Sequence, residues 1–163
     1  ATIGADGRPR SRVVLLKETS QNGLVFFTHY TSPKGEELAA NPVASATFWW
    51  PGLMRQVRAV GAVTKLTRQE NETYFAKRPR ASQLGAWASR QSTPIVSHDD
   101  LIEAAAQAAE RFEGKDVPCP SEWGGYRIDV DEFEFWQGQS GRLHDRVLAR
   151  RNADGWGAIH IQP

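Results

Sequence analysis

Cysteine is nearly absent from this sequence, since Cys119 is the only one among 163 residues. A single cysteine excludes an internal disulfide and a metal site built from several cysteines, and it favours an intracellular, cytoplasmic protein. The chain also lacks a long apolar run and a signal-peptide pattern. We therefore expect no membrane partner and no metal.

An excess of one charge is lacking too. Twenty Lys and Arg residues against nineteen Asp and Glu give a formal net charge of +1. Without a global positive field, any basic site must be local, and a nucleic-acid-binding barrel is a poor interpretation. The length predicts one domain over 1–163. The chain begins at Ala1 in what resembles the end of a strand, so we expect that N-terminal sequence is missing.

The residues that are present indicate a mainly β protein. Asn22-Gly23 is a strong hairpin signal, and Asp154-Gly155 predicts a turn into a last strand. Apolar or alternating runs predict the other strands at 11–17, 24–28, 43–50, 56–66, 126–130, 132–137 and 143–150.

Three helices are predicted between these strands. One covers 33–40, with Ser32 as N-cap. A second begins at a capping box over 67–70 and runs to about Arg78, where Pro79 ends it. A third covers 97–112, with an apolar stripe and a closing Gly114. Hairpins with inserted helices favour a closed antiparallel barrel with peripheral helices.

The segment from Trp136 to Arg146 is the most informative part of the chain. If it is a strand, Arg142, His144 and Arg146 share one face. Three cationic or potentially cationic groups repel one another, and they suit an anionic or electron-rich planar molecule lying across them. The alternative is a solvated edge strand whose charges discourage aggregation.

Further polar groups gather at the ends of predicted elements. Thr28, Ser32 and Lys34 surround a helix N-terminus, where free N–H groups, hydroxyls and a lysine suit a phosphate. An ordinary helix cap with a solvated lysine is the alternative. Arg12 and Lys17 flank the predicted strand at 11–17.

A second phosphate could be held by Tyr74, Arg78 and Ser82, because arginine offers a forked donor and the hydroxyls complete it. A surface helix end is the alternative. Gln56 and the pair Gln91-Ser92 supply neutral donors that suit the edges of a heteroaromatic ring, although each is also an ordinary polar group of a loop or strand.

Five motifs in order resemble the pyridoxamine (pyridoxine) 5′-phosphate oxidase family, over the whole chain. They are Arg12-Val-Val-Leu-Leu-Lys17, Arg78-Pro-Arg-Ala-Ser82-Gln-Leu-Gly-Ala-Trp87, Arg90-Gln91-Ser92, Trp123-Gly-Gly-Tyr-Arg127 and Glu134-Phe-Trp136-Gln-Gly followed by Arg142-Leu-His144-Asp-Arg146. The resemblance implies a split β-barrel and a homodimer with two FMN sites between the subunits. It also implies oxidation of pyridoxamine or pyridoxine 5′-phosphate to pyridoxal 5′-phosphate, with dioxygen as electron acceptor and hydrogen peroxide as product.

The resemblance also implies roles for single residues. Those similar to FMN contacts are Arg12, Val13, Val14, Leu15, Leu16, Lys17, Phe27, Thr28, Lys34, Gln56, Gln91 and Ser92, with Trp136 and Arg146 acting on the FMN of the other subunit. Those similar to substrate contacts are Lys17, Tyr74, Arg78, Ser82, Arg142 and His144. Arg142 and His144 resemble the catalytic pair that holds the pyridine ring over the flavin.

The chain departs from the family pattern at Ser32-Pro33-Lys34, where many members have Ser-Arg-Lys. We also expect that the N-terminal segment that helps to cover the substrate in the family is missing here. Two other functions stay open: a related flavoenzyme that oxidises phenazine precursors, and a split-barrel protein that only binds flavin, haem or a deazaflavin. The intact run from Arg78 to Ser82 favours the vitamin B6 reaction, because a substrate without phosphate needs no phosphate clamp.

Overall fold

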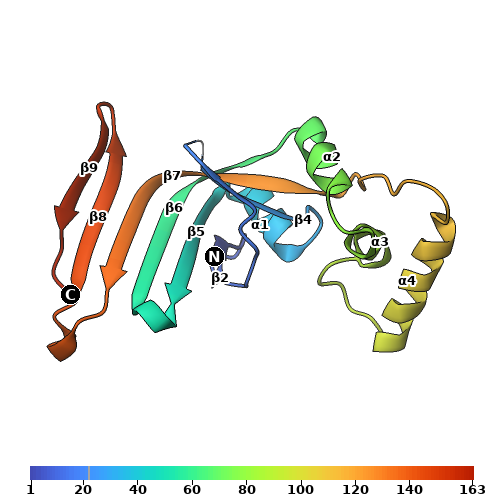
Figure 1. Ribbon diagram of the computed structural model, residues 1–163, viewed down its shortest axis with the longest axis horizontal. Helices are drawn as coiled ribbons and strands as arrows, with labels where there is room; N and C mark the ends of the chain where they lie inside the picture. Colours follow the sequence, from blue (N-terminus) through green and yellow to red (C-terminus); the bar gives the residue numbers. More distant parts are fainter. Residues whose placement is uncertain (22) are drawn as a thin grey trace.

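The computed structural model describes residues 1–21 and 23–163 as a mainly β protein with a curled antiparallel sheet (Figure 1). The main path of the seven-stranded sheet is β3 (Glu18–Ser20), β4 (Gly23–His29), β7 (Trp123–Gln137), β6 (Arg55–Lys65) and β5 (Val43–Trp50). The sheet continues from β7 into β8 (Asp145–Asn152) and β9 (Gly155–His160), and a separate ribbon pairs β1 (Thr2–Ile3) with β2 (Pro9–Arg10). The predicted split-barrel class is confirmed, as a curled half-barrel whose main path ends at β3 and β5.

Strand β7 is the centre of the sheet. Its first half pairs with β4, its second half pairs with β8, and β6 lies beside both halves. Two separate strands at 126–130 and 132–137 were predicted, and this is wrong, because one strand of 15 residues covers both. A bulge opposite Val60 and Gly61 shifts the register there, and it interrupts the alternation that marks a continuous strand.

The predicted helix starts are confirmed. The helices are α1 (Pro33–Ala40), α2 (Arg68–Ala76), α3 (Arg80–Ala88) and α4 (His98–Arg111), and two short 3-10 turns are η1 (Pro51–Leu53) and η2 (Ser140–Arg142). Ser32 caps α1, and reciprocal capping boxes open α2 and α4. Among residues 1–21 and 23–163, no helix combines the length and apolarity that a membrane crossing requires.

The region around Pro79 differs from the prediction in two ways. Helix α2 ends at Ala76, so Arg78 does not share a helix face with Tyr74. A further helix, α3, begins directly after Pro79 and carries Ser82. Proline ends the helix that precedes it and is also well suited to begin the next helix. The prediction included the helix end at Pro79 but not the helix start.

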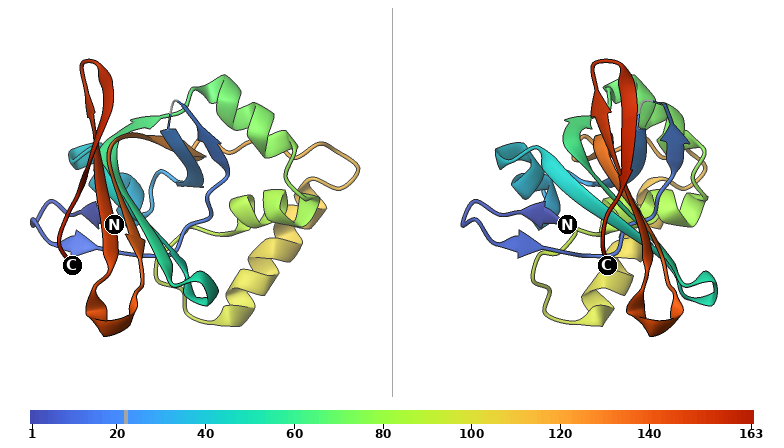
Figure 2. Two further views of the ribbon diagram at one scale, coloured as in Figure 1. Left: turned by 60° about the vertical axis from the view of Figure 1, so that its left-hand side comes forward. Right: turned by 90° about the vertical axis from the view of Figure 1, so that its left-hand side faces the viewer.

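Two apolar clusters hold the fold together. One lies between the sheet and α1 and includes Phe26, Leu38 and Tyr126. The other lies among α2, α3 and α4 and includes Phe75, Phe112 and Trp123. Figure 1 shows these three helices at one end of the molecule and the β8–β9 hairpin at the other, and the left view of Figure 2 shows the same separation.

The apolar run at 11–17 is not a strand, contrary to the prediction. It has no regular structure, and Val13 and Leu15 are 94% and 67% exposed. Lys17 alone joins the sheet, through its N–H to the carbonyl of Val25 at 2.8 Å. An apolar run indicates side chains that favour burial. The run alone does not tell whether they are buried in the chain's own core or against another molecule.

The segment before β8 is not extended either, so Arg142, His144 and Arg146 do not share a strand face. Arg142 ends the turn η2 with a φ of 61°, next to Gly141 with a φ of 63°. Strand β8 begins only at Asp145, and His144 precedes it. The glycine accounts for the difference, because it adopts the left-handed conformation that turns the chain. The hairpin predicted at Asn22-Gly23 is present as the β3–β4 pair, while Asn22 lies outside the described residues.

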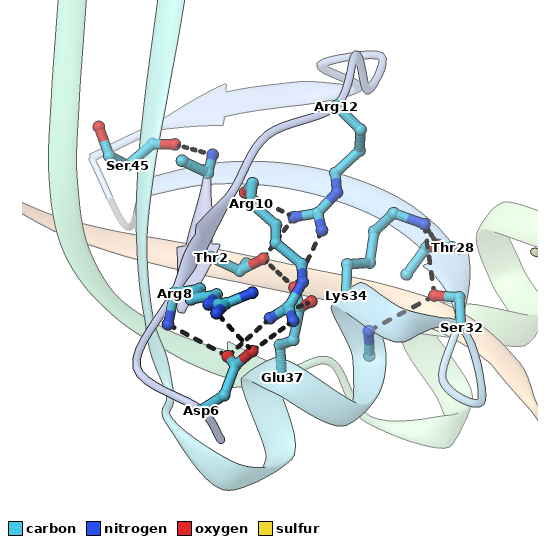
Figure 3. A network of polar contacts seen from close by, with 12 residues as sticks. Thr2, Asp6, Arg8, Arg10, Arg12, Thr28, Ser32, Lys34, Glu37 and Ser45 are labelled. Atoms are coloured by element: carbon cyan, nitrogen blue, oxygen red, sulfur yellow. Dashed lines mark hydrogen bonds and ion pairs between the residues drawn. The ribbon is translucent and has the colours of Figure 1, made fainter. Parts of the chain in front are cut away.

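A buried carboxylate ties the N-terminal ribbon to α1 (Figure 3). Glu37, with its side chain 8% exposed, accepts hydrogen bonds from the Thr2 hydroxyl and from Arg12 Nη2, the latter at 2.9 Å. Arg10 Nη1 lies 3.6 Å from the same carboxylate. Burial acts to raise the pKa of Glu37, but these hydrogen bonds and the two guanidiniums outweigh it and lower the pKa below its ordinary value.

Glu37→Gln is expected to lower the free energy of unfolding at neutral pH by about 2 kcal/mol, because it removes a charged acceptor from buried donors. A carboxyl whose pKa is lowered by folding stabilises the protein above its unfolded pKa of about 4.3, and this contribution is lost as the pH falls below it. Urea denaturation at several pH values measures both effects. The control is Glu36→Gln, an exposed position on the same helix. Equal losses in the two variants would contradict the expectation.

Candidate functional site

One cleft of about 910 Å³ gathers most of the predicted site residues from distant parts of the chain. The segment at 11–17, the end of β4, α1, the α2–α3 junction and the loop after α3 all reach it. The predicted residues that line it are Arg12, Val13, Val14, Leu15, Lys17, Phe27, Thr28, Lys34, Tyr74, Arg78, Ser82, Gln91 and Ser92. The volume lies at the upper end of the range for small-molecule sites, about 300–1,000 Å³.

Lys34 lies in the floor of this cleft and is only 7% exposed. Its ammonium donates to the Thr28 hydroxyl at 3.0 Å, to Gln91 Oε1 at 2.9 Å and to the Ser32 hydroxyl at 3.3 Å. All three acceptors are neutral, and within the described part of the chain no carboxylate lies at ion-pair distance from Lys34. Burial, followed by the nearby Arg12, lowers the pKa of Lys34. A buried ammonium without an anion suits an anionic ligand.

Arg12 differs from Lys34 although both line the cleft. Its guanidinium is already paired with Glu37 at 2.9 Å and also donates to the carbonyl of Arg10 at 3.1 Å (Figure 3). Lys34, unlike Arg12, has no carboxylate of the described residues at ion-pair distance. The predicted cluster of Thr28, Ser32 and Lys34 at the start of α1 is present, with the Ser32 hydroxyl accepting from the Gly35 N–H at 3.4 Å.

A stack of aromatic rings and a second cation, Arg78, also line the cleft. The rings of Tyr74 and Phe27 stack with centroids 3.9 Å apart, and Phe27 stacks on Trp123 at 5.1 Å. The Arg78 guanidinium lies over the Trp123 ring at 4.6 Å. Arg78 Nη1 is buried and finds no hydrogen-bond acceptor in the described residues, and burial lowers the pKa of Arg78. An unpaired buried donor of a guanidinium is the arrangement that an incoming oxyanion would complete.

Seven lining residues of the cleft are not among the predicted site residues: His29, Lys77, Pro79, Gly85, Ala86, Ser89 and Trp123. Trp123 belongs to a motif quoted above without a role, and His29 follows Thr28 directly. His29 is two residues beyond Phe27 on β4, and the alternation of a strand could have placed both on one side. Burial, then Arg78 and Lys34, lowers the pKa of His29 below its ordinary value, which favours the neutral imidazole at neutral pH.

Six predicted residues lie outside this cleft. Leu16 lines a neighbouring cavity of about 230 Å³. Gln56 and Trp136 line a separate cleft of about 430 Å³ at the other end of the sheet. The remaining three, Arg142, His144 and Arg146, lie at the β7–β8 connection or on β8.

Trp136, Arg142, His144 and Arg146 form a C-terminal group of predicted site residues. The His144 ring packs on Trp136 with centroids 4.6 Å apart, and His144 Nδ1 accepts from the Gln139 N–H at 3.1 Å. Arg146 is held by Glu134. Because β8 and the helices lie at opposite ends of the molecule (Figure 1), this group does not reach the first cleft of its own chain. The predicted site residues therefore form two separate groups on the chain.

Two family models match the chain. Residues 1–112 match the model of the family described as pyridoxamine 5′-phosphate oxidase. Residues 123–163 match that described as the pyridoxine 5′-phosphate oxidase C-terminal dimerisation region. The second match contains four of the six predicted residues that lie outside the first cleft: Trp136, Arg142, His144 and Arg146.

Similar proteins have been curated or solved. The chain is 48% identical over 163 residues to a pyridoxine/pyridoxamine 5′-phosphate oxidase of Rubrobacter xylanophilus, covering all of this chain and 75% of that protein. It is 49% identical to one of Thermosynechococcus vestitus, covering 77% of it. The solved structure of PhzG from Burkholderia lata, in complex with tetrahydrophenazine-1-carboxylic acid, superposes with a TM-score of 0.92 at 33% identity, covering 99% of this chain and 79% of that one.

A pyridoxamine 5′-phosphate oxidase-related, FMN binding protein from Nostoc punctiforme has a TM-score of 0.79 at 17% identity, covering 99% of this chain and 85% of that one, which supports the fold alone. The two family matches together span nearly the whole chain, and the curated relatives cover all of it. The chain therefore belongs to the pyridoxamine 5′-phosphate oxidase family of enzymes.

Proposed function

We propose that this protein oxidises pyridoxamine 5′-phosphate or pyridoxine 5′-phosphate to pyridoxal 5′-phosphate, with FMN as cofactor, as a cytoplasmic homodimer. Dioxygen accepts the two electrons and two protons and leaves as hydrogen peroxide. The amine substrate also consumes one water and releases ammonia, whereas the alcohol does not. The carrying observation is one cleft in which two cations, Lys34 and the Arg78 Nη1 end, are shielded from solvent and have no anionic partner in the described chain.

The two cations suit two phosphorylated ligands. Lys34, with Thr28 and the loop residues Gln91 and Ser92, would hold the FMN phosphate and the edge of its ring. Arg78, with Tyr74 and Ser82, would hold the phosphate of the substrate. FMN, when bound, supplies the two-electron acceptor that the amino acids of this chain lack.

The group at the other end of the chain would complete the cleft of a second subunit. Trp136 and Arg146 would contact the FMN there, and Gln56 lies beside Trp136 across the β6–β7 pair. Arg142 would cover the pyridine ring, and His144 would orient its oxygen substituent. Holding two planar rings face to face accounts for much of the rate acceleration in such a reaction, because the reacting atoms are then already close together and correctly oriented.

The exposed apolar side chains support the homodimer. Val13, Leu15, Trp49 and Phe135 are between 45% and 94% exposed. Large apolar side chains left this exposed suit contact with another protein surface. A second copy would cover it and supply the residues that the cleft lacks.

Anaerobic spectroscopy of the purified holoprotein tests the proposal. Pyridoxamine 5′-phosphate is expected to bleach the yellow flavin absorbance, and admission of air is expected to restore it. Tetrahydrophenazine-1-carboxylate is the competing substrate, because the PhzG structure resembles this chain so closely. Bleaching by that compound alone would favour the phenazine reaction, and bleaching by neither would favour a flavin-binding protein without this activity.

Arg78→Met is expected to raise KM for pyridoxamine 5′-phosphate by about 10- to 100-fold, the range of a lost charged hydrogen bond. Turnover at saturation should change little, because the phosphate is remote from the reacting carbon. Steady-state kinetics with unphosphorylated pyridoxamine provide the control, since its KM should not respond to the substitution. An unchanged KM for the phosphorylated substrate would exclude the clamp.

A further inference from the structure

A buried carboxylate lies beneath the C-terminal group, outside both clefts. Glu134 on β7 is only 3% exposed. Its Oε1 accepts from Arg146 Nε at 2.9 Å and from Arg146 Nη2 at 2.7 Å. Its Oε2 lies 2.6 Å from Arg58 Nη2, in an ion pair whose angles fall outside those of a hydrogen bond. One carboxylate thus joins arginines from the two strands on either side of β7.

Arg146 is held at each of its three guanidinium nitrogens. Nε and Nη2 bind Glu134, and Nη1 donates to the carbonyl of Gln162 at 2.8 Å. The carbonyl of Arg146 accepts from the N–H of Ile161 at 3.0 Å, which ties the C-terminal residues to β8. A planar guanidinium bound in this way has a single orientation, and that orientation is set before any ligand arrives.

The backbone does not need Glu134 for this strand pairing. The β7–β8 ladder runs from Glu132 opposite Arg150 to Gln137 opposite Asp145, with regular register. The ladder places the Arg146 backbone opposite Trp136, and Glu134 lies diagonally across from Arg146 on the same face. A buried ion pair also contributes little net stability, because the desolvation of both charges offsets their attraction. Glu134 instead fixes the orientation of the Arg146 guanidinium.

We propose that Glu134 is a positioning residue, which presets the Arg146 guanidinium for the FMN in the cleft of the other subunit. This inference rests on the proposed function, in which Arg146 contacts that FMN. Without Glu134, Arg146 would have to lose side-chain rotational freedom on binding FMN, and the affinity for FMN would fall.

Glu132 provides a matched control. It lies two residues earlier on the same face of β7 and also joins two arginines, with Arg150 Nε at 2.9 Å and Arg58 Nη2 at 3.9 Å. Its side chain is 23% exposed, and no contact to Arg146 is found in the described residues. Replacing either glutamate removes one negative charge from the same cluster, so the comparison cancels the general effect of charge.

The experiment measures the dissociation constant of FMN, by quenching of flavin fluorescence on addition of apoprotein, and the melting temperature of each apoprotein. Glu134→Ala is expected to weaken FMN binding about tenfold, Arg146→Ala by at least as much, and Glu132→Ala less than twofold. Glu134→Gln, which keeps an acceptor at the same place, is expected to recover most of the loss. In the Arg146→Ala background, Glu134→Ala should have no further effect on the affinity.

Three outcomes would overturn the proposal. Equal effects of Glu134→Ala and Glu132→Ala on FMN affinity, with Arg146→Ala still harmful, would reduce Glu134 to a structural role. A fall in melting temperature without a change in affinity would do the same. If Arg146→Ala leaves the affinity unchanged, Arg146 is not an FMN contact and the inference fails with it, while the bleaching experiment still judges the proposed function separately. Should Glu134→Ala not fold, Glu134→Gln against Glu132→Gln decides, with about threefold weaker binding expected against none.

Discussion

Lys34→Met is expected to weaken FMN binding by about 100-fold, the upper range for a charged hydrogen bond lost from a buried site. The apoprotein should be as stable as the unmodified one or more stable. Lys34 is 7% exposed, and its ammonium donates to neutral oxygens of Thr28, Ser32 and Gln91 without a carboxylate partner among the described residues, so its burial is costly until an anion is bound. Methionine has a similar length and carries no charge that must be desolvated.

Fluorescence titration with FMN and thermal denaturation of the apoprotein measure the two effects of Lys34→Met. Lys115→Met, at an exposed position outside the cleft, makes the same change of charge and should alter neither quantity. A lower melting temperature together with unchanged FMN affinity would mean that Lys34 supports the fold and does not hold a phosphate.

Arg142→Ala is expected to reduce turnover by about 100-fold or more, as the loss of one electrostatic contact to the reacting group commonly does. Its effects on FMN retention and on stability should be small. Arg142 is exposed, and its φ of 61° is no harder for alanine than for arginine. The Arg142 side chain therefore contributes little to the stability of the isolated chain, which agrees with a role across a subunit interface.

Steady-state kinetics and the flavin absorbance of the purified variant measure the Arg142 effect. Arg8→Ala removes a charge of the same kind from the exposed turn between β1 and β2, and it should leave turnover unaltered. Arg142→Lys separates charge from shape, since a lysine keeps the charge but loses the planar fork. Unreduced turnover of the Arg142→Ala variant would contradict a catalytic role for Arg142.

Local signals predicted the elements whose ends depend on a few neighbouring residues. Ser32 caps α1 and the capping box at Thr67 opens α2, as predicted, because these contacts lie within three residues of one another. The turn at Asp154-Gly155 was predicted for the same reason: glycine permits a φ of 124° there.

The predictions failed where one local pattern has more than one tertiary outcome. The apolar run at 11–17 was interpreted as a buried strand, yet it lines a cleft with its side chains exposed. The spacing of Arg142, His144 and Arg146 matched a strand, but Gly141 turns the chain before β8 begins. Pro79 ended one helix as expected and also started α3, which was not predicted.

The sequence by itself determined the kinds of groups present and their family, because motif order and residue type are properties of the chain alone. It identified Lys34 and Arg78 as candidate phosphate ligands without showing that they lie in one cleft. Tertiary structure alone decided that Arg12 is already paired with Glu37, that Arg78 Nη1 has no partner in the described residues, and that Glu134 holds Arg146. The physical reason is that burial and charge pairing arise from contacts between distant segments, which no local pattern contains.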